Sequence, residues 1–126
     1  MIYGIGVDLA QISRIENAYE RFGMRFANRI LGKSELADFS KTKRPVRFLA
    51  MRFAAKEAAS KAFGTGFKQG VAPRQIEVTH NKAGKPSLVF SGQAQVLAET
   101  NNITGSHVSL TDESDFAVAY VILEQV

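Results

Sequence analysis

The longest helical pattern of the chain lies in its middle, between a proline and a glycine-rich stop. Apolar residues recur every three or four positions through it, which is the spacing of one buried helix face. That face consists of Phe48, Met51, Ala55, Ala59 and Ala62. Pro45 suits the first turn, where its missing N–H costs nothing, and Gly64-Thr65-Gly66 is a typical stop. The pattern therefore predicts one long helix from Pro45 to Phe63.

The residues before this helix predict a strand and then short helices. Ile2–Val7 is apolar and rich in β-branched residues, and glycines interrupt it at positions 4 and 6. Glycine inside a strand often marks a bulge or the close approach of another group. Asp8 follows at the predicted end of the strand. Ser13 and Glu16 match a capping box, which predicts that a helix begins near Arg14. The helices expected here cover residues 14–22, a continuation after Gly23, and residues 35–40.

The second half of the chain is mostly β in pattern. A hairpin is expected from the alternation in residues 75–80 and 87–91, around a turn at Asn81–Pro86. After a short amphipathic helix over residues 92–101, a second hairpin should join residues 107–111 and 116–123. The last strand is apolar almost throughout, so it should be central or buried in an assembly. The fold class predicted is α+β, an antiparallel sheet with a long central helix and shorter helices packed on it, in a single domain over residues 1–126.

Composition narrows the classes of function. The chain has 126 residues, of which 45% are hydrophobic and 22% charged, and these are ordinary values for a globular domain. Its lack of cysteine excludes disulfides, zinc–thiolate sites and thiol nucleophiles. No apolar run is long enough to cross a bilayer, and no basic segment precedes the first apolar residues as in a signal peptide. These features predict a soluble, cytoplasmic protein.

Charge is distributed unevenly along the chain. Residues 1–61 hold 12 of the 16 Lys and Arg and 6 of the 12 Asp and Glu, whereas residues 86–126 hold five acids and no Lys or Arg. The basic first half suits an acidic partner, namely nucleic acid, an acidic protein or a phosphorylated small molecule. A nucleic-acid module should show aromatic residues interleaved with basic ones. The phenylalanines instead sit mostly at apolar-spaced positions, which disfavours that class.

The acids best placed for chemistry are Asp8, after the glycine-broken strand, and Glu57, on the long helix. Two carboxylates brought together repel each other, and Mg²⁺ is the usual remedy, held by one or two carboxylates and by substrate phosphates. Lys61 and Arg52 lie on the same helix and could neutralise phosphate oxygens. The simpler alternatives are that Asp8 caps a turn and that Glu57 and Lys61 form a surface ion pair at i,i+4 spacing. No Walker A or dinucleotide fingerprint is present.

Four segments of the chain form a recognisable set. In order, they are Gly4-Ile5-Gly6-Val7-Asp8, the block RFAAKEAASKAFGTG over residues 52–66, the turn ending in Gly84-Lys85-Pro86, and His107-Val108-Ser109. Taken together they resemble the holo-[acyl-carrier-protein] synthases, the small homotrimeric class of 4′-phosphopantetheinyl transferases. The long block is the most specific of the four. The resemblance covers nearly the whole chain, from the first strand to the last.

The resemblance implies a reaction. Members of this family transfer the phosphopantetheine arm of coenzyme A to a serine hydroxyl of apo acyl carrier protein, and adenosine 3′,5′-bisphosphate leaves. It implies that Asp8 and Glu57 bind Mg²⁺ and that Lys61 stabilises charge or donates a proton near the pyrophosphate. Either Glu57 or a metal-bound water could take the serine proton. It also implies a role in fatty acid biosynthesis. A scaffold that kept the fold without activity is disfavoured because Asp8, Glu57 and Lys61 are all present.

The resemblance further implies binding surfaces. The coenzyme A pocket would lie between adjacent subunits of a homotrimer, lined by Arg52, Gly64, Gly66, Lys85, Pro86 and His107. Acyl carrier protein would dock on Arg14, Arg21, Arg25 and Phe26. The alternative for these arginines is a solvated face, the commoner fate of a charge run. One departure is clear: several relatives have a second histidine in an HxSxxH pattern, and here Asp112 occupies that position.

Overall fold

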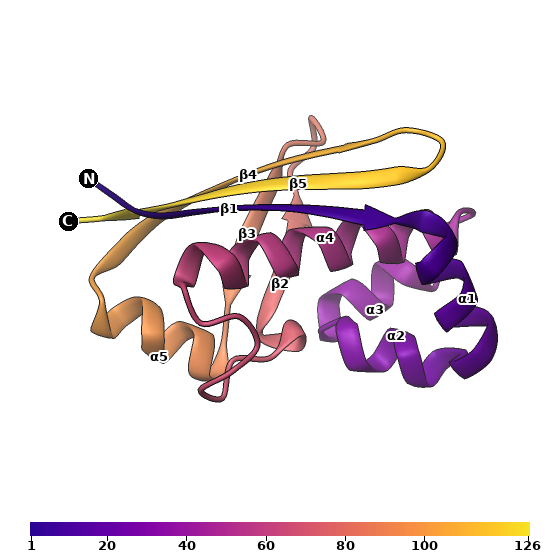
Figure 1. The fold of residues 1–126 in the computed structure, drawn as a ribbon, viewed down its shortest axis with the longest axis horizontal. Coiled ribbons are helices and arrows are strands. Elements are labelled where there is room, and N and C mark those ends of the chain that lie inside the picture. The colour runs from indigo at the N-terminus through magenta and orange to yellow at the C-terminus, as the bar shows by residue number, and fades with distance from the viewer.

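The computed structural model describes all of residues 1–126 (Figure 1). In chain order the elements are β1 (Ile2–Gln11), α1 (Ile12–Phe22), α2 (Met24–Ile30), α3 (Lys33–Phe39), α4 (Pro45–Phe63), the 3₁₀ turn η1 (Pro73–Gln75), β2 (Ile76–His80), β3 (Pro86–Phe90), α5 (Gly92–Thr100), β4 (Ile103–Asp112) and β5 (Phe116–Gln125). The α+β class and the antiparallel pairing predicted from the sequence are confirmed. No helix combines the length and the apolar character that a membrane span requires.

The strands form two antiparallel sheets. The larger has the order β1-β5-β4, so the apolar last strand is central, as its composition predicts; the smaller is the β2–β3 hairpin. Figure 1 shows the long helix α4 running beneath the three-stranded sheet, with α1, α2 and α3 grouped around one of its ends and α5 beyond the other. The sequence indicates both hairpins but not their division into two sheets, because that depends on contacts between distant segments.

Helix α4 has the bounds that the sequence predicts. Pro45 stands in its first turn, and Gly64 ends it in the left-handed conformation, with φ of 84° and its N–H donating to the carbonyl of Lys61. The long helix lies at the centre of the core because alanines cover much of its surface. Ala54, Ala55, Ala58 and Ala59 are all fully buried. Phe48 and Met51 are only half-buried, at the end where the helix is less covered.

The glycines of β1 let that strand lie directly on α4. A Cβ atom built on Gly6 would lie 1.8 Å from the carbonyl oxygen of Ala58, and one on Gly4 would lie 2.0 Å from that of Ala62. No real side chain tolerates such distances, so strand and helix touch backbone to backbone. Side chains alternate along β1, and Gly4, Gly6, Asp8 and Ala10 therefore face α4.

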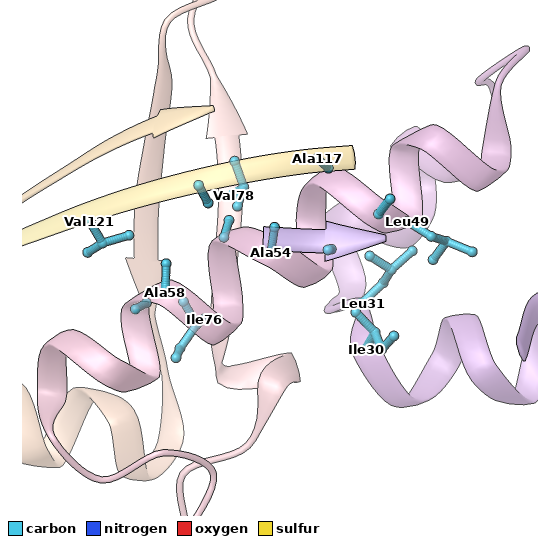
Figure 2. Close-up of a cluster of buried hydrophobic side chains, with 14 of the residues drawn as sticks. Ile30, Leu31, Leu49, Ala54, Ala58, Ile76, Val78, Ala117 and Val121 are labelled. Carbon is cyan, nitrogen blue, oxygen red and sulfur yellow. The ribbon is translucent and has the colours of Figure 1, made fainter. Parts of the chain in front are cut away.

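The remaining core fills the space between α4, the two sheets and the helices before it. Figure 2 shows Ala58 of α4 near Val121 of β5 and Ile76 of β2, with Ala54 further along the helix. Leu49 lies near Ile30 and Leu31, at the end of α2. Phe39 stacks edge-on against Tyr19, with ring centroids 5.8 Å apart, and thereby joins α3 to α1. One continuous core thus fixes α4 against every layer of the fold.

A buried ionic network fastens α4 on the side away from β1. Glu35 and Lys56 are completely buried, and Arg52 is 5% exposed. The ammonium of Lys56 donates to Glu35 Oε1 at 2.5 Å and to the carbonyl of Ile76, while Arg52 donates to Glu35 Oε2 at 3.2 Å and to the carbonyl of Val78. The carboxylate also accepts the N–H groups of Gly32 and Val78. Every polar atom is therefore paired, which is the condition for burying such charges.

Two predicted boundaries near the N-terminus are wrong. Strand β1 continues to Gln11 because it pairs with β5 as far as Phe116, so Asp8 lies inside the strand and not at its end. Helix α1 begins at Ile12, and its N-cap residue Gln11 makes no side-chain capping bond, so the capping box of Ser13 is not formed. Ile12 is buried, and its N–H donates to the carbonyl of Asp115. Tertiary contacts therefore place the helix start ahead of the local signal.

We expect Gly6→Ala to destabilise the protein by about 3 kcal/mol or more, because the new methyl group can be admitted only if β1 moves off α4. The free energy of unfolding would be measured by urea denaturation. Asn17→Gln adds one methylene group on the exposed surface of α1 and should cost much less. Equal losses for the two variants would contradict the close-approach role of Gly6.

We expect Glu35→Gln to cost about 3–5 kcal/mol of folding stability, because it leaves Lys56 and Arg52 as uncompensated charges in the core. Urea denaturation measures this loss as well. Glu99→Gln, a change on the exposed surface of α5, should stay within about 0.5 kcal/mol of the parent. A Glu35→Gln variant as stable as the Glu99→Gln control would show that the network does not hold α4.

Candidate active site

The structure brings Asp8, Glu57 and Lys61 together at the contact between β1 and α4. Asp8 faces the helix from β1, and the ammonium of Lys61 donates to its Oδ1 at 3.1 Å and to the carbonyl of Val7 at 3.1 Å. Glu57 lies one helical turn before Lys61, so the two side chains share a face of α4. The side chain of Asp8 is only 15% exposed, whereas that of Lys61 is 52% exposed. Asp8 is therefore the buried part of the cluster, and Lys61 is its solvent-exposed part.

The surroundings of Glu57 disfavour its ionised form. Burial raises the pKa of the Glu57 carboxyl above its ordinary value, the negative charge of Asp8 raises it further, and Lys61 opposes both effects. Asp8 and Glu57 are thus close enough to repel each other. A pair of carboxylates of this kind is where a divalent cation would be stabilising. The simple surface ion pair, considered for Glu57 and Lys61 from the sequence, is not the arrangement found, because Lys61 reaches across to Asp8.

The residues at this site fit a cation that takes one or two ligands from the protein and the rest from water and substrate. No group of three or more His, Asp or Glu side chains gathers in the chain, so the protein does not form a complete cage. Two carboxylates beside an open face match the mode in which Mg²⁺ is held by one or two acids, water and substrate phosphates. Asp8 and Glu57 could hold it in that way, with Lys61 beside them.

The loop after α4 leaves its backbone open. Gly64 and Gly66 both have positive φ, 84° and 60°, and a Cβ atom on either would meet nothing within 4 Å. The N–H of Gly66 donates back to the carbonyl of Ser60, which folds the loop over the end of the helix. A ligand could therefore approach this backbone closely, one turn beyond Lys61.

Arg52 lies apart from the Asp8 cluster. Its guanidinium is held by Glu35 and the carbonyl of Val78, and it stacks over the ring of Phe48 at 4.3 Å. Beside it is a hollow of about 240 Å³, which Arg44 and His80 also line. Arg52 and the Asp8 cluster occupy different faces of α4.

The predicted docking residues surround a surface that leads to Asp8. Arg14, Arg21 and Arg25 are exposed on α1 and α2, and Phe26 is half-buried between these helices. A hollow of about 390 Å³ is lined by Asp8, Arg14 and Phe26, among others. A second hollow of about 260 Å³ lies between α1 and α2, beside Arg25 and Phe26. A basic and apolar surface therefore opens onto the carboxylate cluster.

His107 lies on the opposite face of the sheet from Asp8. In the register of the sheet, Asp8 is opposite Ala119, and Ala119 is opposite Leu110, so these three side chains share the face that packs on α4. His107 is three residues from Leu110 and therefore points the other way, with its side chain 60% exposed. Lys85 and Pro86 lie at the turn of the β2–β3 hairpin, in the other sheet. Within one chain, His107, Lys85 and Pro86 therefore do not lie at the Asp8 cluster.

Comparison with known proteins places this arrangement in a family. Residues 4–121 match the 4′-phosphopantetheinyl transferase superfamily. A relative from Vibrio cholerae, a holo-[acyl-carrier-protein] synthase, is 52% identical over 125 residues, which are 99% of each protein. The chain belongs to the 4′-phosphopantetheinyl transferase superfamily. The predictions that it is an enzyme of this kind and that it resembles the holo-[acyl-carrier-protein] synthases are confirmed.

Solved structures agree over the full length. The crystal structure of holo-[acyl-carrier-protein] synthase from Neisseria meningitidis matches with a TM-score of 0.95 and 41% identity, covering 99% of this chain and 100% of that one. The Bacillus anthracis synthase, solved in complex with CoA (3′,5′-ADP), matches with a TM-score of 0.83 and 38% identity, covering 100% and 99%. The predicted fold class is thus also confirmed by comparison.

The sequence interpretation overlooked the residues that hold the site in place. Glu35 and Lys56 were not singled out, although they are the most deeply buried charges in the protein. A signal was present, because Arg52 and Lys56 are four residues apart and share a face of a helix that is otherwise rich in alanine. Two cations on such a face require a buried acid, and Glu35 is that acid.

We expect Glu57→Gln to raise the melting temperature of the protein at neutral pH without divalent cations. The folded-state pKa of Glu57 is raised above its ordinary value of 4.5, so its ionised form is destabilising at neutral pH. The gain should shrink as the pH falls towards 4, where Glu57 is protonated in both states. Thermal melts at pH 7.5 and pH 4 measure it, with Glu99→Gln as the control. A gain that is independent of pH would contradict a raised pKa of Glu57, to which burial contributes most and Asp8 adds.

Proposed function

We propose that the protein transfers the 4′-phosphopantetheine group of coenzyme A to a serine hydroxyl of apo acyl carrier protein and releases adenosine 3′,5′-bisphosphate. The observation that carries the proposal is the meeting of Asp8, Glu57 and Lys61 beside an open hollow. Family membership and the names of the full-length relatives support the reaction. The relative solved with CoA (3′,5′-ADP) supports coenzyme A as co-substrate.

In this reaction the serine oxygen bonds to the phosphorus next to the pantetheine arm, and the bond from that phosphorus to the bridging pyrophosphate oxygen breaks. Positioning and charge neutralisation contribute most to such a transfer. Asp8 and Glu57 would hold Mg²⁺, which supplies positive charge to the pyrophosphate oxygens when bound. Lys61 is beside Asp8 with its side chain 52% exposed, and its ammonium would stabilise charge on the leaving oxygen. The serine proton would go either to Glu57 or to a water molecule.

Glu57 is suited to proton transfer as well as to cation binding. The pKa of its carboxyl lies above the ordinary value because of burial and Asp8, so it is a better base than a solvated glutamate. Asp8 is instead paired directly with Lys61. The two acids therefore differ in environment, as acids with different roles do.

We further propose that the active site lies between subunits of a homotrimer. The outward face of the large sheet carries a row of apolar side chains, of which Ile5, Val7 and Leu9 are 55%, 53% and 60% exposed. Such a row on a sheet face is typical of a protein–protein interface. His107 lies on this same outward face and points away from the Asp8 cluster of its own chain. In the proposed trimer it would face the Asp8 cluster of a neighbour. The same assembly would bring Arg52, Gly64, Gly66, Lys85 and Pro86 to the coenzyme A pocket.

Carrier docking is proposed on the surface formed by Arg14, Arg21, Arg25 and Phe26. Its chemistry suits an acidic helical protein, because exposed guanidinium groups surround an apolar centre. Arg21 and Arg25 also stack near the ring of Phe22, at 5.2 Å and 6.0 Å from its centroid. Steering by these charges would speed encounter and weaken with salt. The proposed setting is a cytoplasmic single-domain enzyme, residues 1–126, that supplies holo carrier protein for fatty acid biosynthesis.

The test is to incubate the purified protein with coenzyme A, Mg²⁺ and apo acyl carrier protein and to detect the phosphopantetheine adduct by mass spectrometry. We expect one adduct per carrier, lost when EDTA removes divalent cations. Glu57→Gln should lower the rate by roughly a hundredfold or more while the protein stays folded, because it removes a carboxylate that would hold Mg²⁺ and could take the serine proton. Glu99→Gln should leave the rate unchanged. The absence of an adduct with every carrier tried would refute the proposal.

A further inference from the structure

His107 is held by a carboxylate on the neighbouring strand. Its Nε2 atom lies 2.5 Å from Oε1 of Glu124, which projects from β5 on the same outward face. The two residues are not directly opposite, since His107 is in register with Ile122 and Glu124 with Gly105. The contact is therefore diagonal across the strand pair, a geometry that long side chains can reach.

The residue opposite Glu124 leaves room for this diagonal contact. A Cβ atom built on Gly105 would lie 3.2 Å from Glu124 Oε1 and 3.4 Å from its Cβ. A side chain at position 105 would thus compete with the glutamate for the space it uses to reach His107. The glycine and the carboxylate together define where the imidazole is placed.

The chemistry of the pair fixes which ring nitrogen is free. An ionised carboxylate only accepts hydrogen bonds, so Nε2 of His107 must carry the shared hydrogen and donate it. The hydrogen bond and the charge of His107 hold the pKa of Glu124 below its ordinary value, so the carboxylate is ionised wherever the enzyme would work. Other titratable groups on this face are Tyr120 and the amino group of Met1, which donates to the carbonyl of Gln125 at 2.8 Å. In the protonated ring Nδ1 also carries a hydrogen, which it is free to donate to an anionic ligand.

We propose that Glu124 is a positioning residue for coenzyme A: it orients the imidazolium of His107 so that Nδ1–H donates to an anionic phosphate group of the nucleotide held at the subunit interface. The inference rests on the proposed function, since it takes His107 as a contact of coenzyme A. Glu124 itself touches neither the nucleotide nor the reacting atoms. It acts through the ring, as a carboxylate that orients a histidine does in other sites.

The test separates this role from a structural one by kinetics on single and double variants. Glu124→Ala should raise KM for coenzyme A roughly tenfold, the value of one charge-assisted hydrogen bond, and leave kcat at saturating coenzyme A nearly unchanged. Glu124→Gln keeps an acceptor at the same place and should raise KM by less. In a His107→Ala background, either change at position 124 should have no further effect. Glu99→Ala serves as the surface control, and light scattering checks that each variant keeps the parent's assembly state.

Each outcome decides the inference. Loss of the effect of both Glu124 variants in the His107→Ala background supports it. Equal increases in KM with and without His107, or no increase in either Glu124 variant, would overturn it while leaving the transferase reaction intact. If His107→Ala alone leaves KM for coenzyme A unchanged, the histidine is not a contact of the nucleotide, and the inference fails with that part of the proposed site. Absence of transfer by the parent enzyme would instead refute the proposed function itself.

Discussion

The backbone contact between β1 and α4 is the constraint on which the site depends. Gly4 and Gly6 have no side chains to separate the strand from the carbonyls of Ala62 and Ala58, so the two elements approach as closely as backbones can. Asp8 follows two residues after Gly6 on the same face, and its position is then determined by the pleat. It must meet the turn of α4 that carries Lys61. The glycines thus act on the chemistry only through geometry, since neither has a group that could react.

Helix α4 carries charged residues on two faces, one of which is buried in the core and the other partly exposed to solvent. On one face, Lys56 is fully buried and paired with Glu35, in a network where every polar atom has a partner. On the other face, the next residue, Glu57, is only partly covered and stands near Asp8, which raises its pKa. The sealed network sets the rotation of the helix about its axis, and that rotation aims Glu57 at the strand. Stability on one face therefore maintains an unfavourable charge pair on the other, as functional sites commonly require.

The sequence predicted the parts of the fold that depend on local chemistry. Pro45 and Gly64 bound the long helix because their backbone preferences are intrinsic, and the alternation of the later strands depends only on their own pleat. The start of α1 could not be predicted in this way, because the N–H of buried Ile12 is bonded to the carbonyl of Asp115, 103 residues further along the chain. Asp8, Glu57 and Lys61 were singled out from their placement and charge, and the family resemblance supplied their predicted roles. The structure adds that Lys61 pairs with Asp8 in place of Glu57.

The geometry of the three-stranded sheet explains why a site that uses both Asp8 and His107 would need two chains. Alternation along a strand sends neighbouring side chains to opposite faces, so a single sheet cannot present Asp8 and His107 to the same side while both keep their register with β5. The inward face is filled by α4, and the outward face carries the exposed row of Ile5, Val7 and Leu9. In the proposed trimer, burial of that row against a neighbouring subunit would also bring His107 of one subunit to the Asp8 cluster of the next. Assembly and completion of the site would then have the same cause, the packing of apolar sheet faces, and a change that separates the subunits would remove activity without touching Asp8, Glu57 or Lys61.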